Sequence, residues 1–144
     1  MGLGSLLWPV LGHLVLVQVL FAMVSLRRFQ AVRRGEARYG QMARAGGEPE
    51  LSRRWARNLD NQFQVPLLFY ALVALLYATG QVAPGRPDLV QTGLAWVFLA
   101  GRIAHTVVQV SRDDVKLRGR VFAINYLALS AMWLLFFARQ IGLS

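Results

Sequence analysis

Three stretches of this sequence carry no charged side chain, and each is long enough, or nearly so, to cross a lipid bilayer. They are residues 3–26, 61–85 and 121–138, and a fourth apolar run, residues 89–111, is interrupted only by Arg102. A helix needs roughly 20 predominantly apolar residues to span the hydrocarbon core. Four such runs leave too little of the 144 residues for a separate soluble domain. We therefore predict an all-α integral membrane protein with one domain, residues 1–144, and spans at about 4–26, 61–80, 89–111 and 120–139.

The first apolar run reads as a retained span. A cleaved signal peptide begins with positive charge, whereas here no Lys or Arg precedes the run, and Arg27 and Arg28 follow it. The chain has no cysteine, which excludes disulfides, thiolate nucleophiles and cysteine metal sites within it. We predict no metal site.

Basic residues gather in two of the connections between spans. Nine arginines lie between residues 26 and 58, and three arginines and Lys116 lie between the third and fourth spans, whereas the other connection and the C-terminus carry only Arg86 and Arg139. The positive-inside rule predicts that both basic loops are cytoplasmic, with both termini on the other side. Fifteen arginines to one lysine indicate a GC-rich bacterial coding bias. We expect these loops to meet anionic lipid headgroups and predict no nucleic-acid binding.

The connections also carry helix signals. No Pro or Gly interrupts residues 26–34, so we expect the first helix to continue through Arg38. Residues 45–52, with two glycines and a proline, predict a loop, after which Ser52 is a candidate cap for the next helix. Residues 81–88 predict a tight turn in which Asp88 caps the third span.

Polar side chains recur at helical spacing inside three spans. Such groups are costly in a bilayer and usually face a bundle interior or a watery cavity, and residues three or four apart share a helix face. The members are Arg57, Asn61, Gln64 and Leu68 on the second span, with Asn58 and Asp60 beside them; Arg102, His105, Thr106, Gln109 and then Arg112 or Asp113 on the third; and Arg118, Arg120, Asn125 and Tyr126 at the start of the fourth.

Taken singly, these residues have ordinary structural interpretations. An amide in a span often only bonds a neighbouring helix, and a lone histidine more often packs than binds a ligand. Arg118 and Arg120, at the end of a loop, can simply set topology. Asp60 can be the internal partner of Arg102, and Pro66 can mark a kink or a helix start.

Taken together, the same residues favour a binding site. Arg57, Arg102 and Arg118 lie at similar depth on three spans and face one carboxylate, Asp60. Uncompensated guanidinium groups in a low-dielectric cleft are costly unless an anion joins them, and Arg matches carboxylates in a bidentate way. The spacing therefore predicts a cytoplasm-facing cleft for a small, polar, anionic ligand, open sideways to lipid.

Two motifs resemble the MAPEG family, the membrane-associated proteins in eicosanoid and glutathione metabolism. The family's second span carries Arg, three residues, Asn, two residues, Glu, with a Pro soon after, and here Arg57, Asn61, Gln64 and Pro66 take these places. The segments GRIAHTVVQV (residues 101–110) and VKLRGRV (residues 115–121) are similar to the pattern of the microsomal prostaglandin E synthases and glutathione transferases in this family. In that pattern a second Arg, here Arg118, follows the first by about sixteen residues.

The resemblance implies a four-helix bundle that assembles as a homotrimer, with glutathione as cofactor between neighbouring subunits. The coding bias and the basic loops predict a bacterial inner membrane. A small lipophilic substrate would arrive through the bilayer. Arg118 would be catalytic, because a positive hydrogen-bond donor that favours the thiolate lowers a thiol pKa. By position, the residues of the glutathione site would be Arg38, Arg57, Asn61, Gln64, His105, Gln109 and Arg118.

The sequence departs from the family pattern at three positions: Gln64 replaces the motif Glu, Gln109 replaces an aromatic hydroxyl, and Gly119 replaces a hydroxyl donor. The first hypothesis is therefore a glutathione-dependent transferase or peroxidase that acts on lipophilic electrophiles. The second is a non-catalytic MAPEG-like binding or scaffold protein. A small transporter or channel subunit is a third, disfavoured because no span shows the paired carboxylates or broken helices of many transporters.

Overall fold

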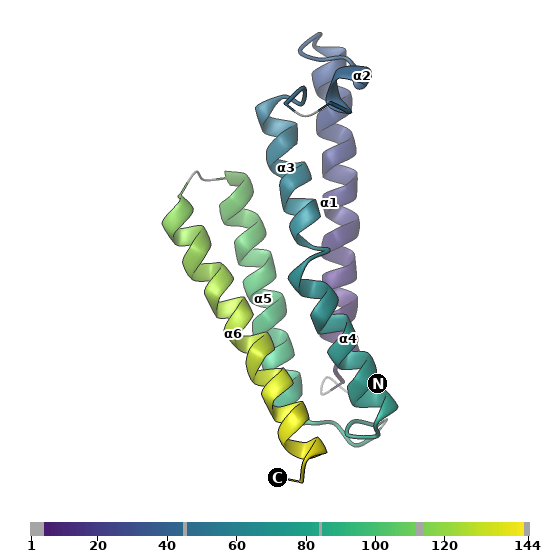
Figure 1. The fold of residues 1–144 in the computed structure, drawn as a ribbon. Coiled ribbons are helices and arrows are strands. Elements are labelled where there is room, and N and C mark those ends of the chain that lie inside the picture. Colours follow the sequence, from purple (N-terminus) through teal and green to yellow (C-terminus); the bar gives the residue numbers. More distant parts are fainter. Residues whose placement is uncertain (1–4, 45, 84, 112–113, 143–144) are drawn as a thin grey trace.

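The structure is a computed structural model that describes residues 5–44, 46–83, 85–111 and 114–142. Within these ranges the chain forms six helices, which stand as an antiparallel bundle with both ends of the chain at one end (Figure 1). The turn between α5 and α6 and the longer connection that contains α2 lie at the other end. The helices are α1 (Leu7–Arg33), α2 (Tyr39–Met42), α3 (Glu50–Asn61), α4 (Val65–Ala78), α5 (Leu89–Ser111) and α6 (Val115–Gln140).

Four segments are long and apolar enough to cross a membrane: α1, the α3–α4 segment over Glu50–Ala78, α5 and α6. Their outward faces carry large exposed apolar side chains, among them Val15, Leu67 and Leu127, each more than 60% exposed. Exposure on this scale is expected where lipid covers the helix, since a bilayer solvates apolar side chains. The prediction of an all-helical protein with four membrane spans is confirmed.

The interior divides into two apolar clusters. Near the end that carries the termini, α4, α5 and α6 pack through Phe69, Phe98 and Met132, and the rings of Phe69 and Phe98 stack with centroids 4.6 Å apart. A smaller cluster joins α1 to α3 and includes Leu20 and Leu59. Polar side chains occupy the space between these clusters, so the bundle is apolar at one end and hydrogen-bonded in its middle.

The first helix ends earlier than predicted. Arg33 is its last residue, and Gly35 takes a left-handed backbone conformation with φ of 71°. The N–H groups of Gly35 and Glu36 then donate to the carbonyls of Val32 and Ala31, which is the Schellman arrangement that closes a helix. The expected helical continuation through Arg38 is therefore wrong, because Gly35 supplies the stop signal one residue beyond the uninterrupted run.

The second span is broken between Asn61 and Val65. The expectation that no span is broken is therefore wrong, whereas the interpretation of Pro66 as a kink or a helix start is confirmed, because α4 begins at Val65. Pro66 explains the position of the break: it has no N–H to donate, and its ring clashes with the carbonyl four residues earlier, on Gln62. The N–H groups of Gln62 and Phe63 instead donate three residues back, over 2.9 and 3.0 Å. Gln64 precedes α4 with φ of −93° and ψ of −96°.

Helix starts agree with the predictions in one case of three. Asp88 caps α5 as predicted, because its carboxylate accepts the N–H groups of Val90 and Gln91, each over 3.0 Å. Ser52 does not cap α3: the helix begins at Glu50, and the Ser52 hydroxyl donates to the carbonyl of Pro49 over 3.0 Å. The last span also begins earlier than predicted, at Val115 rather than near residue 120.

This early start of α6 follows from the cap at Asp114, whose carboxylate accepts the N–H of Leu117 over 2.9 Å. Arg118 and Arg120 therefore lie on the helix and not at the end of a loop.

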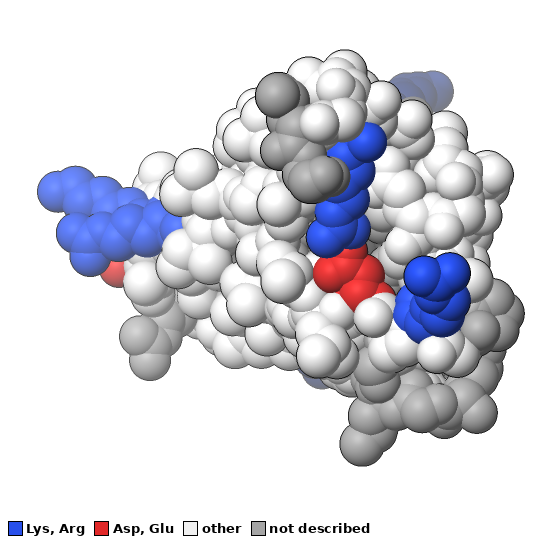
Figure 2. Space-filling view, turned by 90° about the horizontal axis from the view of Figure 1, so that it is seen from below, with Lys and Arg blue, Asp and Glu red and all other residues white. Residues whose placement is uncertain are grey.

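The end of the bundle that carries the termini is largely uncharged, with acidic atoms beside basic ones near its centre (Figure 2). Asp88 forms an ion pair with Arg139 at this end and so ties the start of α5 to the end of α6.

Candidate functional site

A buried arginine holds the broken span. The side chain of Arg102, on α5, is 1% exposed. Its Nε and Nη2 donate to Oε1 of Gln62 over 3.0 and 2.8 Å, and Nη2 also donates to the carbonyl of Asn61 over 2.9 Å. In an unbroken helix the Asn61 carbonyl would accept the N–H of Val65, so Arg102 satisfies an acceptor that the break leaves free.

The interpretation of Asp60 as the internal partner of Arg102 is therefore wrong. In the part of the chain that the structure describes, Arg102 forms no ion pair with Asp60 and is bonded by an amide and a backbone carbonyl instead. The reason is the break itself, which turns Gln62 and the Asn61 carbonyl toward α5. Asp60 remains on the other side of the break, where it faces a hollow.

Gln62 is the centre of a buried hydrogen-bond network. Its Nε2 donates to Oδ1 of Asn58 over 2.8 Å, and its Oε1 lies 3.1 Å from Nε2 of His13 on α1. Because Oε1 can only accept, the His13 proton lies on Nε2, and Nδ1 accepts the Tyr70 hydroxyl over 2.5 Å. Thr106, on α5, donates to Asn58 Oδ1 over 3.2 Å. The network links α1, α3, α4 and α5.

Sequence reasoning did not single out Gln62 or His13. A signal for Gln62 was present, because it follows Asn58 by four residues and precedes Pro66 by four. The first spacing puts both amides on one helix face, and the second places Gln62 where a proline disrupts the helix. No comparable signal marks His13, whose partners come from distant segments.

A hollow of about 420 Å³ lies beside this network, between α3, α5 and α6. It brings together six of the seven residues predicted to bind a ligand; whether they bind one stays a prediction. Arg38 does not line it. That residue lies in the turn ahead of α2, where its N–H donates to Oε1 of Gln41 over 2.9 Å. The lining residues are Arg57, Asp60, Asn61, Gln64, His105, Gln109 and Arg118.

The stripe predicted along the third span supplies one wall. Arg102, His105, Thr106 and Gln109 are all buried, as expected for one face of a helix. Arg112 and Asp113, the expected continuation of the stripe, lie outside the described residues. On the second span Leu68 does not join Arg57, Asn61 and Gln64 at the hollow, because the break changes the direction of the chain before α4.

One part of this wall is already hydrogen-bonded within the protein, and another part is not. Asn61 Nδ2 donates to Oε1 of Gln109 over 3.1 Å, which ties α3 to α5. Nδ1 of His105 is buried and has no hydrogen-bond partner among the described residues, and the ring lies beside Phe122 with centroids 6.2 Å apart. A buried polar atom without a protein partner is a position where a ligand or water can bond.

The hollow carries an excess of positive charge. Arg57 enters it from α3 and Arg118 from α6, and among the described residues Asp60 is the only carboxylate on its lining. Among the described residues neither arginine forms an ion pair, in contrast to Arg28, Arg53 and Arg139 elsewhere in the chain. Guanidinium groups bind carboxylate and phosphate through paired hydrogen bonds. The arrangement can therefore hold a small anionic ligand.

Comparison with curated proteins and with solved structures gives no match to this chain. The comparison with protein families gives one, which agrees with the resemblance of the second and third spans. The sequence matches the model of the MAPEG family over residues 5–138. This match includes three of the four membrane-spanning segments, all but the last two residues of the fourth, and every described residue that lines the hollow, and the protein therefore belongs to the MAPEG family.

Proposed function

We propose that the protein is a glutathione-dependent transferase or peroxidase that acts on lipophilic electrophiles. Members of the MAPEG family include glutathione transferases, peroxidases and eicosanoid synthases, and they commonly use glutathione. The observation that carries the proposal is the convergence of Arg57 from α3, His105 from α5 and Arg118 from α6 on one polar hollow. Its volume lies within the range of about 300–1,000 Å³ that is typical of small-molecule sites.

The charges of the hollow suit glutathione, which carries two carboxylates, one ammonium group and a thiol. Arg57 and Arg118 would bind carboxylate oxygens or the thiolate through charge-assisted hydrogen bonds. We assign Arg118 the catalytic role, since a guanidinium beside the sulfur favours the thiolate and lowers the pKa of the thiol. The thiolate sulfur would then form a C–S bond to the electrophile while the leaving group departs with its bonding electron pair, and the thiol proton would pass to solvent.

The setting of the hollow suits a substrate that is dissolved in lipid. Ile103 and Val107 of α5 and Phe122 of α6 are exposed apolar side chains on the helices that frame the hollow. An electrophile in the bilayer can therefore approach along an apolar surface and meet a polar site at its end. By the positive-inside rule, the end of the bundle with the basic loops faces the cytoplasm, where glutathione is made.

We also propose that the protein works as a homotrimer in a bacterial inner membrane. The hollow is formed by one chain and is open on one side, and a neighbouring subunit would supply the missing wall. Arg38, which lies away from the hollow of its own chain, would then serve the site of a neighbour. The mass of the detergent-solubilised protein, measured by light scattering with correction for bound detergent, tests the trimer.

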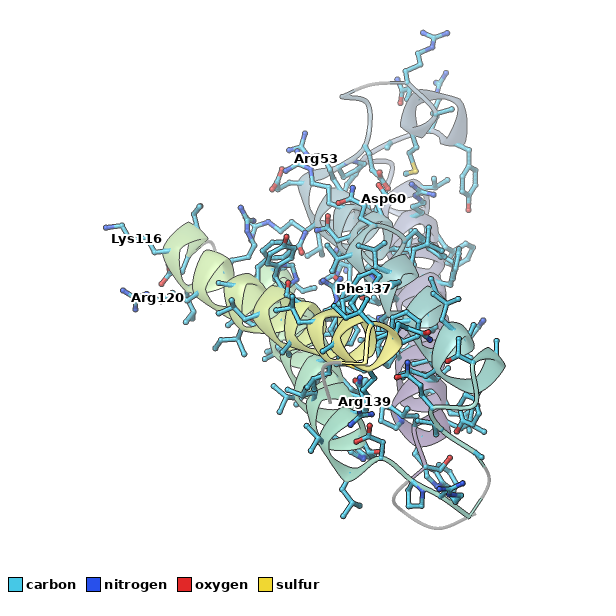
Figure 3. The ribbon with its side chains drawn as sticks, turned by 60° about the horizontal axis from the view of Figure 1, so that its bottom comes forward. Arg53, Asp60, Lys116, Arg120, Phe137 and Arg139 are labelled. Atoms are coloured by element: carbon cyan, nitrogen blue, oxygen red, sulfur yellow. The ribbon has the colours of Figure 1, made fainter. Side chains whose placement is uncertain are left out.

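The test of function is thermal unfolding of the purified protein with and without millimolar glutathione, together with conjugation of a standard aromatic electrophile. A ligand that binds only the folded state stabilises it by about 2.7 kcal/mol at a hundredfold excess over Kd. Arg118→Ala should lose the glutathione shift and the turnover. Arg120→Ala is the matched control, because Arg120 lies on the same helix and points away from the other helices, like Lys116 (Figure 3).

A non-catalytic binding role is the second candidate, and the three departures from the family pattern favour it. Gln64 and Gln109 line the hollow as neutral amides where the family has a carboxylate and an aromatic hydroxyl, and Gly119 has no side chain. A glutathione shift without conjugation or peroxide reduction would support this role. The broken second span does not revive a transporter, because Arg102 already bonds the freed carbonyl of Asn61, which is then not open to an ion.

A further inference from the structure

Within residues 5–44, 46–83, 85–111 and 114–142, Asp60 is the one acidic residue on the lining of the hollow, and no arginine of these ranges pairs with it. Arg102, the arginine expected to neutralise it, is bonded by Gln62 and the Asn61 carbonyl. Arg28 on α1 is near enough for an electrostatic interaction, but its guanidinium is held by Glu48 over 2.6 and 3.2 Å. Among the described residues the Asp60 carboxylate therefore forms no ion pair.

Asp60 lies near two arginines of the hollow but forms no ion pair with either of them. Arg57 and Asp60 are three residues apart on α3 and so share a face of that helix. Asp60 lies further along α3 than Arg53, which is near the start of the helix (Figure 3). Arg118 reaches the same hollow from α6. Two positive groups and one negative group thus surround one space.

This pattern is complementary to an anionic ligand that also carries an ammonium group, rather than to a ligand that carries carboxylates alone. A ligand with carboxylates alone would be repelled by Asp60, whereas a ligand that also carries an ammonium group would pair with it. The other polar groups of the lining offer an ammonium group no negative charge, because Asn61 and Gln109 bond one another over 3.1 Å and the side chains of Gln64 and His105 are not carboxylates. A carboxylate binds an ammonium group more strongly than a neutral amide does.

We propose that Asp60 binds the ammonium group of the ligand and makes the site selective for amino-acid-like ligands over their deaminated forms. This inference rests on the proposed function, in which the ligand is glutathione and the group is its γ-glutamyl α-amino group. Asp60 would thereby supply the negative charge that Gln64 lacks. Asp60 lies four residues before Gln64 in the chain, across the break in the second span, and both residues line the same hollow.

The experiment measures Kd by calorimetry for two probes: glutathione, and glutaryl-cysteinyl-glycine, which lacks only the α-amino group. Each is titrated into the wild-type protein, Asp60→Asn and Glu50→Gln. The last variant is the control, because it removes one negative charge from the same helix, at a residue that pairs with Arg53 and Arg54 and does not line the hollow. The melting temperature of each unliganded variant reports whether it folds.

Asp60→Asn should weaken glutathione binding about tenfold, which is the lower end for a hydrogen bond between charged groups and suits an exposed side chain. The deaminated peptide should bind the wild type about tenfold more weakly than glutathione does. Asp60→Asn should not weaken binding of this peptide, because the variant also removes the repulsion between Asp60 and the carboxylates of the peptide. Glu50→Gln should match the wild type with both probes. The two losses are then not additive, which a general disturbance of the fold would not produce.

Two results would overturn the inference, and they differ from failure of the proposed function. Glutathione binding that is equally tight in Asp60→Asn and the wild type would show that the ammonium group lies elsewhere. Equal weakening of both probes by Asp60→Asn would show that Asp60 supports the site without touching that group. If glutathione does not bind the wild type at all, the proposed function fails and this inference fails with it.

Discussion

Replacing Arg102 by methionine should destabilise the protein, although it removes a charge from the interior. Methionine keeps an unbranched apolar stem of similar length but loses three hydrogen bonds, two to Gln62 and one to the Asn61 carbonyl. A buried polar group left without a partner costs about 1–3 kcal/mol. Since the Asn61 carbonyl loses its partner and Gln62 Oε1 keeps only His13, we expect a loss of about 2–4 kcal/mol in the free energy of unfolding.

The assay is unfolding by sodium dodecyl sulfate in mixed micelles, followed by circular dichroism. Gln91→Met is the matched control: Gln91 is also fully buried on α5, but it donates one hydrogen bond, to the Met132 carbonyl over 3.1 Å, and lies near the other end of the helix. That variant should lose about 1 kcal/mol or less, in line with single bonds in membrane proteins. Both variants remove a buried polar side chain, so their difference isolates the bonds of Arg102.

A double-mutant cycle sharpens the prediction. If Arg102 acts through Gln62, then Arg102→Met should cost less in a Gln62→Leu background, with a coupling of about 0.5–3 kcal/mol. Burial of an ion is itself costly, and exchange of buried ions for apolar side chains is sometimes stabilising. An unfolding free energy of Arg102→Met equal to or above that of the wild type would therefore refute the argument that Arg102 stabilises the break.

Three further predictions concern the helix contacts and caps. Gly101→Ala would place its Cβ 1.7 Å from Oδ1 of the buried Asn125, so it should cost about 1–3 kcal/mol of unfolding free energy, and less in an Asn125→Ala background. Burial by itself raises the pKa of Asp88, but Arg139 and two N–H groups of α5 have the larger opposite effect. The pKa of Asp88 in the folded protein is therefore below its usual value. The stabilisation is thus present above the ordinary carboxyl pKa of about 4 and is lost as the pH falls through the folded-state pKa. Asp88→Asn, which keeps a cap, should be less stable than the wild type at pH 7, and the difference should vanish in acid. Gly35→Ala should lower the unfolding free energy by about 1 kcal/mol, because only glycine adopts φ of 71° without strain; a loss near zero in thermal unfolding would contradict the C-cap assignment.

Part of the candidate site was visible in the sequence because a helix fixes the spacing of its faces. Arg102, His105 and Gln109 follow one another at three and four residues, and all three are buried on the same side of α5. Arg118 was predicted to lie near them both from its depth in the predicted topology and from the motif. Its position in the hollow depends on the cap at Asp114, which starts α6 early enough to carry Arg118 toward α3.

The choice of hydrogen-bond partners was not visible in the same way. Opposite charge favoured Asp60 as the partner of Arg102, but the structure pairs Arg102 with the neutral amide of Gln62. Pro66 breaks the span four residues after Gln62, and the backbone then turns an amide and a free carbonyl toward α5 while Asp60 faces the hollow. A pairing of this kind depends on the path of three helices at once, which no local pattern encodes.

Features that depend only on residues close together in the sequence could thus be predicted from the sequence alone. The four spans follow from the length of the apolar runs, the cap at Asp88 from a short side chain before a helix, and the charge asymmetry from simple position. The tertiary structure was needed for the extent of the break at Pro66, for the bonds of Arg102, and for the finding that Asp60 forms no ion pair with any described residue. In a bilayer the backbone groups freed by a break must find partners within the protein, so packing between helices, and not local propensity, selects which side chains are used and which remain for a ligand.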